Sequence, residues 1–274
     1  MADSDGEKER MKPSWERIMQ DYSRGERKWR LARVPIIGPL LTRGRFKDEI
    51  ESNWMIPVSE PIVRGESVAL PSDVLIPILE KASFIFKINH CPCRDGYGCQ
   101  SYPHEIGCLI MGPGARGIRP EFGKQVSVED AVNHVQKAVK TGLVPLIVHS
   151  TTDSDMFGID YDRMLAVCLC CDCCCDIRKG LRLGPRVFWE NVHRLPGLTV
   201  SVGEACTLCG DCLEVCFRKD IIKLGRERAE ISDLCVGCGK CALVCPVEAI
   251  SFTIEGRERT TERLLAAIKC RTEI

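Results

Sequence analysis

The feature that most constrains the fold is a duplicated run of cysteines near the end of the sequence. Residues 203–221 (GEACTLCGDCLEVCFRKDI) align with residues 232–250 (SDLCVGCGKCALVCPVEAI) at an offset of 29 residues. Four cysteines, a glycine, a valine and the final isoleucine coincide in this alignment. A duplication with so short a period predicts two equivalent half-modules related by pseudo-symmetry.

Both runs have the spacing Cys-x2-Cys-x2-Cys-x3-Cys, which is typical of domains that hold two [4Fe–4S] clusters. The first three thiolates of a run wrap one face of a cube, and the chain then turns into a helix that carries the fourth sulfur towards the other cube. We therefore expect one cluster on Cys206, Cys209, Cys212 and Cys245. We expect the other on Cys235, Cys238, Cys241 and Cys216. Zinc would need two adjacent sites that share all eight cysteines, which is rare in zinc modules.

The stretch Val202–Glu255 resembles the two-cluster bacterial ferredoxins, and it makes up about a fifth of the chain. The resemblance implies a small domain of short antiparallel strands and two short helices around the clusters, with electron transfer as its activity. One departure is visible, because Phe217 stands where a proline usually follows the fourth cysteine. This departure removes no ligand.

Ten further cysteines precede this region in two sets. The first set is Cys91, Cys93, Cys99 and Cys108, and the second is Cys168, Cys170, Cys171, Cys173, Cys174 and Cys175. The joint pattern, CxCR…C…C…CxCCxCCC, resembles one found in poorly characterised iron–sulfur proteins of anaerobes, which pair such a region with a C-terminal dicluster ferredoxin. The resemblance implies that the two sets act together.

Three interpretations of these upstream cysteines remain open. They bind one or two further Fe–S clusters, they form a zinc or other structural thiolate site helped by His90 or His104, or they form a redox-active thiol site. The metal interpretation takes as ligands Cys91, Cys93, Cys99, Cys108, Cys168, Cys170, Cys171, Cys173 and Cys174. Neighbouring side chains diverge along an extended chain, so Cys170 and Cys171 should serve different sites. Arg94 either offsets the negative charge of a cluster or lies on the surface.

The expected fold class is α+β, with a mixed, helix-rich upstream domain. We divide the chain into a charged leader and wrapping segment over 1–60, a cysteine-rich domain over 61–198, a two-cluster domain over 199–256 and a C-terminal helix over 257–274. The apolar stretch Ser72–Phe86 predicts a buried helix, with Pro77 either kinking it or lying in its first turn. A capping pattern at Ser127 predicts an amphipathic helix that Gly142 ends, followed by a short strand over Leu143–Val148. An acidic stretch, Asp153–Asp162, is predicted to be a solvated loop.

Composition excludes several classes of function. The 38 basic residues balance the 38 acidic residues, so no net field favours nucleic acid. No apolar run approaches the ~20 residues of a transmembrane helix. The charged start of the sequence, MADSDGEKERMK, is not a secretory signal. Nineteen clustered cysteines in such a chain indicate metal or redox chemistry in a reducing compartment, and we expect a cytoplasmic protein.

The sequence therefore favours an iron–sulfur electron-transfer protein or subunit that serves redox partner proteins or a larger oxidoreductase complex. Two alternatives remain open. One is a ferredoxin-fed reductase with its substrate site in the upstream domain, and the other is a scaffold for Fe–S or metal assembly, suggested by the adjacent thiols. No catalytic residue is assigned. The glycine-rich stretch Gly112–Gly117 lacks the Gly-Lys-Ser/Thr ending of a P-loop, and no G-x-G-x-x-G follows an expected strand.

Overall fold

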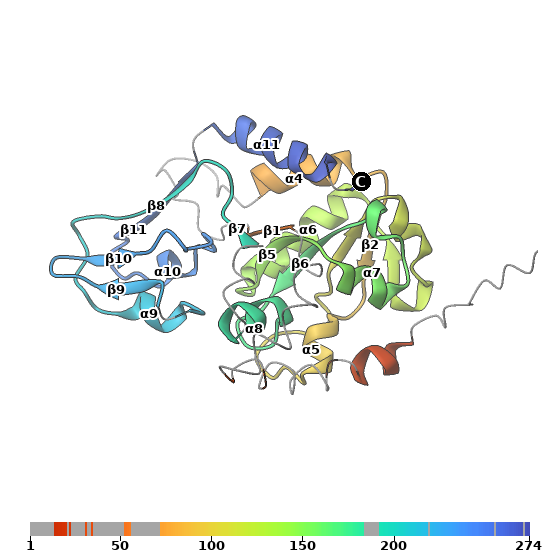
Figure 1. Ribbon diagram of the computed structural model, residues 1–274, viewed down its shortest axis with the longest axis horizontal. Coiled ribbons are helices and arrows are strands. Elements are labelled where there is room, and N and C mark those ends of the chain that lie inside the picture. Colours follow the sequence, from red (N-terminus) through yellow and green to blue (C-terminus); the bar gives the residue numbers. More distant parts are fainter. Residues whose placement is uncertain are drawn as a thin grey trace, which may run out of the picture.

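The computed structural model describes residues 14–20, 22, 31, 34, 52–55, 72–183, 192–218, 220–254, 256–270 and 272–274. These residues form two lobes, which Figure 1 shows side by side. The large lobe is built on a mixed sheet and contains the upstream cysteines. The small lobe spans Leu198–Ile254 and contains the duplicated runs. Most of the predicted wrapping segment lies outside the described residues.

The large lobe is organised by a seven-stranded sheet with the order β4-β2-β3-β6-β5-β1-β7. Its strands are β1 (Ser52–Met55), β2 (Ile85–Ile88), β3 (Leu109–Met111), β4 (Gly123–Gln125), β5 (Val144–His149), β6 (Leu165–Cys170) and β7 (Val192–His193). All neighbouring pairs are antiparallel except β1 and β7. The strand predicted over Leu143–Val148 is β5, and all six of its residues are buried. Sequence patterns alone did not predict the sheet itself.

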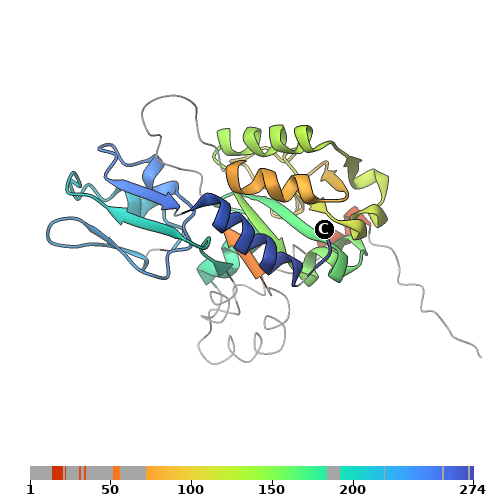
Figure 2. The ribbon, with the colours of Figure 1, turned by 90° about the horizontal axis from the view of Figure 1, so that it is seen from above.

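Three helices lie side by side over one face of this sheet, as Figure 2 shows. They are α4 (Ser72–Lys81), α6 (Val128–Lys140) and α11 (Arg257–Lys269). The predicted Ser72–Phe86 helix is too long, because α4 ends at Lys81 and Phe86 lies in β2. The physical reason is the aromatic and β-branched run Phe84–Ile88, which favours a half-buried strand over a further helical turn.

The helix predicted after Ser127 is confirmed as α6. The Ser127 hydroxyl accepts a hydrogen bond from the backbone N–H of Asp130 at 3.0 Å, so it satisfies one of the free donors of the first turn. Ala131, Val135 and Ala138 are buried and form the apolar stripe of the helix. Gly142, with φ of 83°, turns the chain into β5.

The opposite side of the large lobe carries α5 (Pro92–Gly96) and α8 (Asp176–Leu183), as seen in Figure 1. The predicted acidic loop is wrong in part, because Asp153 lies on α7 (Thr151–Phe157). Burial, reinforced by the nearby carboxylate of Asp176, raises the pKa of Asp153 to about 7.

The small lobe contains two antiparallel pairs of strands and two short helices. The strands are β8 (Leu198–Val202), which pairs with β11 (Ile250–Ile254), and β9 (Ile222–Leu224), which pairs with β10 (Ala229–Ile231). The helices are α9 (Asp211–Val215) and α10 (Lys240–Leu243), which follow equivalent positions of the two cysteine runs.

The backbone of the small lobe repeats at the offset seen in the sequence. Leu208 and its counterpart Gly237 have φ of 58° and 73°, and Gly210 and Gly239 have φ of 87° and 83°. Three of these four left-handed positions are glycines, for which that conformation carries no steric penalty. Leu208 adopts it without that freedom, so the loop geometry is the same in both halves despite the difference in sequence.

The chain returns to the large lobe after the small one. Helix α11 packs against α4, and the following Thr272 hydroxyl donates a hydrogen bond to the Asp162 carbonyl at 2.9 Å. Leu264 and Ile268 are buried on α11. The C-terminal helix is thus part of the large lobe, and the small lobe lies between β7 and α11 in the sequence. None of the helices within the described residues is long and apolar enough to cross a bilayer.

Candidate metal centres

A cavity in the small lobe is bounded by one cysteine of the first run and three of the second. The cysteines that line it are Cys216, Cys235, Cys238 and Cys241. The other lining residues are mainly apolar and include Ile221, Val236 and Phe252. Four sulfur donors within an apolar shell provide both the ligands and the exclusion of water that an iron–sulfur cluster requires.

Hydrogen bonding and burial affect the protonation of these sulfurs. The backbone N–H of Gly237 donates to Cys235 Sγ at 3.4 Å, which favours the thiolate form. Burial raises the pKa of Cys216 to about 11. A thiol with a raised pKa loses its proton at neutral pH only when a metal takes the proton's place.

The remaining four cysteines of the two runs are Cys206, Cys209, Cys212 and Cys245. Two of them accept backbone hydrogen bonds. The N–H of Ala229 donates to Cys206 Sγ at 3.4 Å, and the N–H of Ala249 donates to Cys245 Sγ at 3.2 Å. Burial raises the pKa of Cys212, and the neighbouring sulfurs of Cys209 and Cys206 add to the effect. Backbone donors therefore reach sulfurs from both runs.

In the large lobe, four cysteine sulfurs gather into a compact set, which we call the four-cysteine group. Its members are Cys99, Cys171, Cys173 and Cys174, and all four Sγ atoms lie within 4.8 Å of one another. Cys99 Sγ lies 3.5 Å from Cys173 Sγ, and the backbone N–H of Cys174 donates to Cys171 Sγ at 3.2 Å. A single tetrahedral ion with metal–sulfur bonds of about 2.3 Å holds its thiolates about 3.8 Å apart. The four-cysteine group thus fits one thiolate-bound ion.

The loop that carries Cys99 is held by His104. The Nδ1 atom of His104 contacts the Asp95 carboxylate at 2.6 Å, and its Nε2 atom contacts the Cys99 carbonyl at 2.6 Å. Both ring nitrogens therefore have protein partners. His104 positions the loop and is not available as the zinc ligand that the sequence left open.

The other six upstream cysteines form a second set, the six-cysteine group: Cys91, Cys93, Cys108, Cys168, Cys170 and Cys175. The register of the sheet brings several of them together. Cys168 and Cys170 lie on the same face of β6 because side chains alternate along a strand. The pairing of Leu109 with Val167 places Cys108 beside Cys168, with the two Sγ atoms 3.7 Å apart.

Cys175 belongs to this group although the sequence left it out of the ligand set. The chain turns back between β6 and α8, which brings Cys175 into hydrogen-bonding contact with Cys170. That hydrogen bond lowers the pKa of Cys175. No spacing rule within the sequence indicates this contact. The structure places Cys171 in one group and Cys170 in the other.

Arg94 lies among these cysteines and is completely buried, so the surface alternative is wrong. Its Nη1 atom donates to the Leu169 carbonyl at 2.8 Å, its Nη2 atom donates to the Ile106 carbonyl, and its Nε atom has no hydrogen-bond partner among the described residues. The acidic groups that act most strongly on its charge are the thiols of Cys91 and Cys108. Hydrogen bonds to neighbouring cysteines and burial raise the pKa of both thiols, so these sulfurs would balance the buried charge of Arg94 only as metal-bound thiolates.

Comparison with known proteins decides the chemistry of one region. A family model described as a 4Fe-4S binding domain matches residues 230–251. The small lobe contains an iron–sulfur domain of the ferredoxin type. The matched residues include the whole second run, Cys235–Cys245, and do not include the first run. The curated proteins and the solved structures give no match to the chain.

Contacts between the lobes add candidate residues that sequence reasoning missed. Asp172, which lies between Cys171 and Cys173, forms ion pairs with Arg178 of α8 and with Lys240 of α10. The Tyr102 hydroxyl donates to the same carboxylate at 3.0 Å. The one sequence feature that pointed to these contacts is Phe217, which stands where a proline usually follows the fourth cysteine. Its ring centroid lies 4.6 Å from the Arg178 guanidinium.

Proposed function

We propose that this protein transfers single electrons through two [4Fe–4S] clusters in the small lobe. It does so for redox partner proteins or as a subunit of a larger oxidoreductase complex in the cytoplasm. The observation that carries the proposal is the cavity bounded by Cys216 together with Cys235, Cys238 and Cys241. This set crosses between the runs in the way that the spacing of two-cluster domains demands.

The residues of the small lobe have separate roles in this proposal. One cluster is held by Cys216, Cys235, Cys238 and Cys241, and the other by Cys206, Cys209, Cys212 and Cys245. When bound, such clusters supply one-electron redox chemistry without proton or group transfer. The backbone N–H groups of Gly237, Ala229 and Ala249 stabilise negative charge on the sulfurs to which they donate. The apolar lining of the cavity keeps water away.

We extend the proposal to the large lobe. The four-cysteine group holds one metal ion, because its sulfurs are close enough for a single tetrahedral centre. The six-cysteine group holds a further Fe–S cluster, and Arg94 balances the charge of its thiolates. The cluster of the six-cysteine group would continue the electron path of the small lobe into the large lobe, and the ion of the four-cysteine group would take part only as iron, because zinc has no redox chemistry.

Paired serine variants test the cross-run assignment. We expect Cys216→Ser to alter the EPR signal of the cluster bound by the second run. Cys245→Ser should alter only the signal of the cluster bound by the first run. The matched control is Cys270→Ser, since Cys270 is exposed at the end of α11. Anaerobically purified variants in which Cys216→Ser and Cys212→Ser alter the same signal would contradict the assignment.

A ferredoxin-fed reductase is the second candidate. The observation in its favour is that the six-cysteine group contains two thiols more than the four ligands of a cubane. Serine replacement of Cys93 or Cys171 separates the two functions. Loss of an upstream EPR signal without loss of any turnover favours electron transfer alone. Loss of a measurable substrate turnover favours the reductase.

A further inference from the structure

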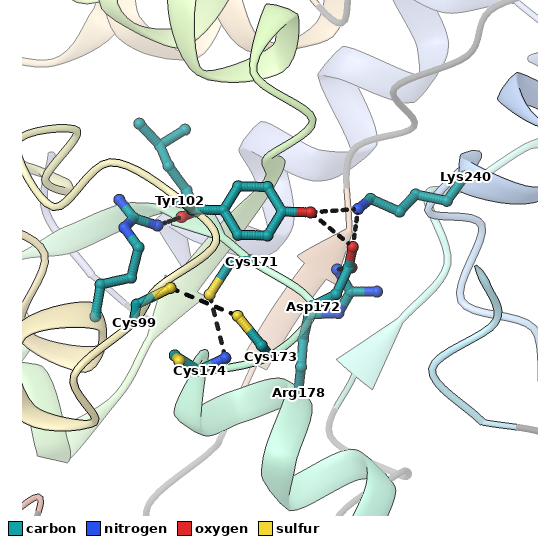
Figure 3. A network of polar contacts seen from close by, with 10 residues as sticks. Cys99, Tyr102, Cys171, Asp172, Cys173, Cys174, Arg178 and Lys240 are labelled. Carbon is teal, nitrogen blue, oxygen red and sulfur yellow. Dashed lines mark hydrogen bonds and ion pairs between the residues drawn. The ribbon is translucent and has the colours of Figure 1, made fainter. Parts of the chain in front are cut away.

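The two lobes meet at a charged junction beside the cavity of the small lobe. Figure 3 shows Asp172 between the four-cysteine group and Lys240, with Tyr102 and Arg178 on the same carboxylate. On the small-lobe side, Lys240 and Phe217 both line the cavity. Each is the sequence neighbour of one of its cysteines, Cys241 and Cys216 respectively. The junction therefore joins the four-cysteine group to one particular cluster site.

Arg178 is the central residue of this junction. Its side chain is 1% exposed, and its guanidinium stacks on the ring of Phe217, 4.6 Å from the centroid. Its Nε and Nη2 atoms are buried without a hydrogen-bond partner among the described residues. Asp172 is its ion-pair partner, and Lys240 shares that carboxylate. Two cations thus share one anion, which leaves an excess of positive charge beside the cavity.

The excess charge acts on one cluster site more than on the other. In the part of the chain that the structure describes, Arg94 and Arg178 are the only buried arginine or lysine side chains, and Arg94 lies in the large lobe. Arg178 acts electrostatically on Cys238 and Cys216 of the cavity, and on its other side on Cys175 and Cys170 of the six-cysteine group. Arg228 precedes Ala229, whose backbone N–H donates to Cys206 of the other site, and the exposed side chain of Arg228 is screened by water. A buried charge keeps most of its effect.

We propose that Arg178 raises the reduction potential of the cluster held by Cys216, Cys235, Cys238 and Cys241 above that of the other cluster. Reduction makes a thiolate-bound cluster more negative, so a fixed buried cation favours the reduced form. This cluster is then the inner end of the small lobe, next to the four-cysteine group. The inference rests on the proposed two-cluster function, and it explains why Phe217 replaces the usual proline: the ring supports the guanidinium.

The test is an EPR-monitored redox titration of the full-length, anaerobically purified protein. The spectra of the Cys216→Ser and Cys245→Ser variants assign the two signals. For Arg178→Gln we expect the reduced-to-oxidised ratio of the inner cluster at fixed potential to fall at least tenfold, a shift of about 59 mV or more. The ratio of the other cluster should change less than about threefold. Arg178→Lys keeps the positive charge, so the reduced-to-oxidised ratio of its inner cluster should stay close to that of the wild type.

Two further variants distinguish an electrostatic effect of Arg178 from a folding defect. Asp172→Asn removes the shared anion from a partly exposed position, so it should raise the reduced fraction of the inner cluster, which is opposite to Arg178→Gln. Arg228→Gln removes one exposed charge and should leave both ratios within about threefold. The inference would be overturned if Arg178→Gln shifted the reduction potentials of both clusters equally. It would also be overturned if the variant showed both EPR signals and an unchanged reduced-to-oxidised ratio of the inner cluster. A wild-type protein without two cluster signals would instead refute the proposed function.

Discussion

The two lobes bring their cysteines together by different means. In the small lobe, short spacing within the second run places three sulfurs, and Cys216 of the first run joins them at the cavity. In the large lobe, partners such as Cys99 and Cys173 are separated by 74 residues, and the register of β3 and β6 decides which cysteines meet. The comparison shows that groups of cysteines that are close in sequence can be predicted from their spacing. Groups of cysteines that strand pairing brings together cannot be predicted in this way.

The largest expected effect is the removal of iron. Eight thiolates cannot converge in the small lobe without metal, and its strands are only three to five residues long. We expect chelation to reduce amide exchange protection across residues 198–254 by about a hundredfold or more. Protection of β5 and β6, which lie in an apolar core, should change far less. A chelated protein that keeps native far-UV CD and native protection in the small lobe would break this comparison.

Replacement of Arg94 tests whether the six-cysteine group is anionic. If the sulfurs are metal-bound thiolates, Arg94→Met leaves buried negative charge unpaired and should reduce the free energy of unfolding by about 3–5 kcal/mol. Arg116→Met, at an exposed cation over the Phe84 ring, should change it by less than about 1 kcal/mol. Anaerobic urea unfolding measures both. An Arg94→Met variant as stable as the wild type would show that the thiols are neutral.

A substitution in the core-facing side of the C-terminal helix tests its membership of the large lobe. Leu264 is fully buried, so Leu264→Ala should reduce the free energy of unfolding of the large lobe by about 2–5 kcal/mol. The EPR signals of the small lobe should be unchanged. Leu243→Ala, at a side chain 60% exposed on α10, is the matched control and should cost less than about 0.5 kcal/mol. Broadened small-lobe signals in the Leu264→Ala variant would place α11 with the small lobe.

The smallest expected effect concerns a purely local feature of the large lobe. Ser127→Ala removes the hydrogen bond to the Asp130 N–H and should destabilise the protein by about 1 kcal/mol. Metal content should stay the same, because α6 carries no cysteine. Thermal unfolding with metal analysis checks both statements. A loss of metal in this variant would mean that α6 supports the cysteine groups directly.

Much of the local structure could be predicted from the sequence. The cap at Ser127, the stop at Gly142 and the strand that became β5 follow from residue chemistry within a few positions. The iron–sulfur domain follows from cysteine spacing, and the family match to residues 230–251 confirms it. The two-cluster ligand sets remain a prediction.

What could not be predicted depends on contacts between distant segments. Phe84–Ile88 continues the apolar pattern of α4, and its local preference for a strand is realised through pairing of β2 with β3 and β4, which are distant in sequence. Cys175 joins the six-cysteine group through a turn without a recognisable spacing rule. The junction of Asp172, Arg178 and Lys240 requires the relative position of the lobes, which no periodicity encodes.

The most direct test of the central claim is the quantitation of iron and acid-labile sulfide in anaerobically purified protein, combined with EPR after reduction. Two small-lobe clusters predict about eight irons and eight sulfides per chain and two EPR signals. Iron beyond these eight, about four for one cluster on the six-cysteine group and one more if the four-cysteine group holds iron, would come from the large lobe. Fewer than about six irons per chain, or iron without matching sulfide, would contradict the account.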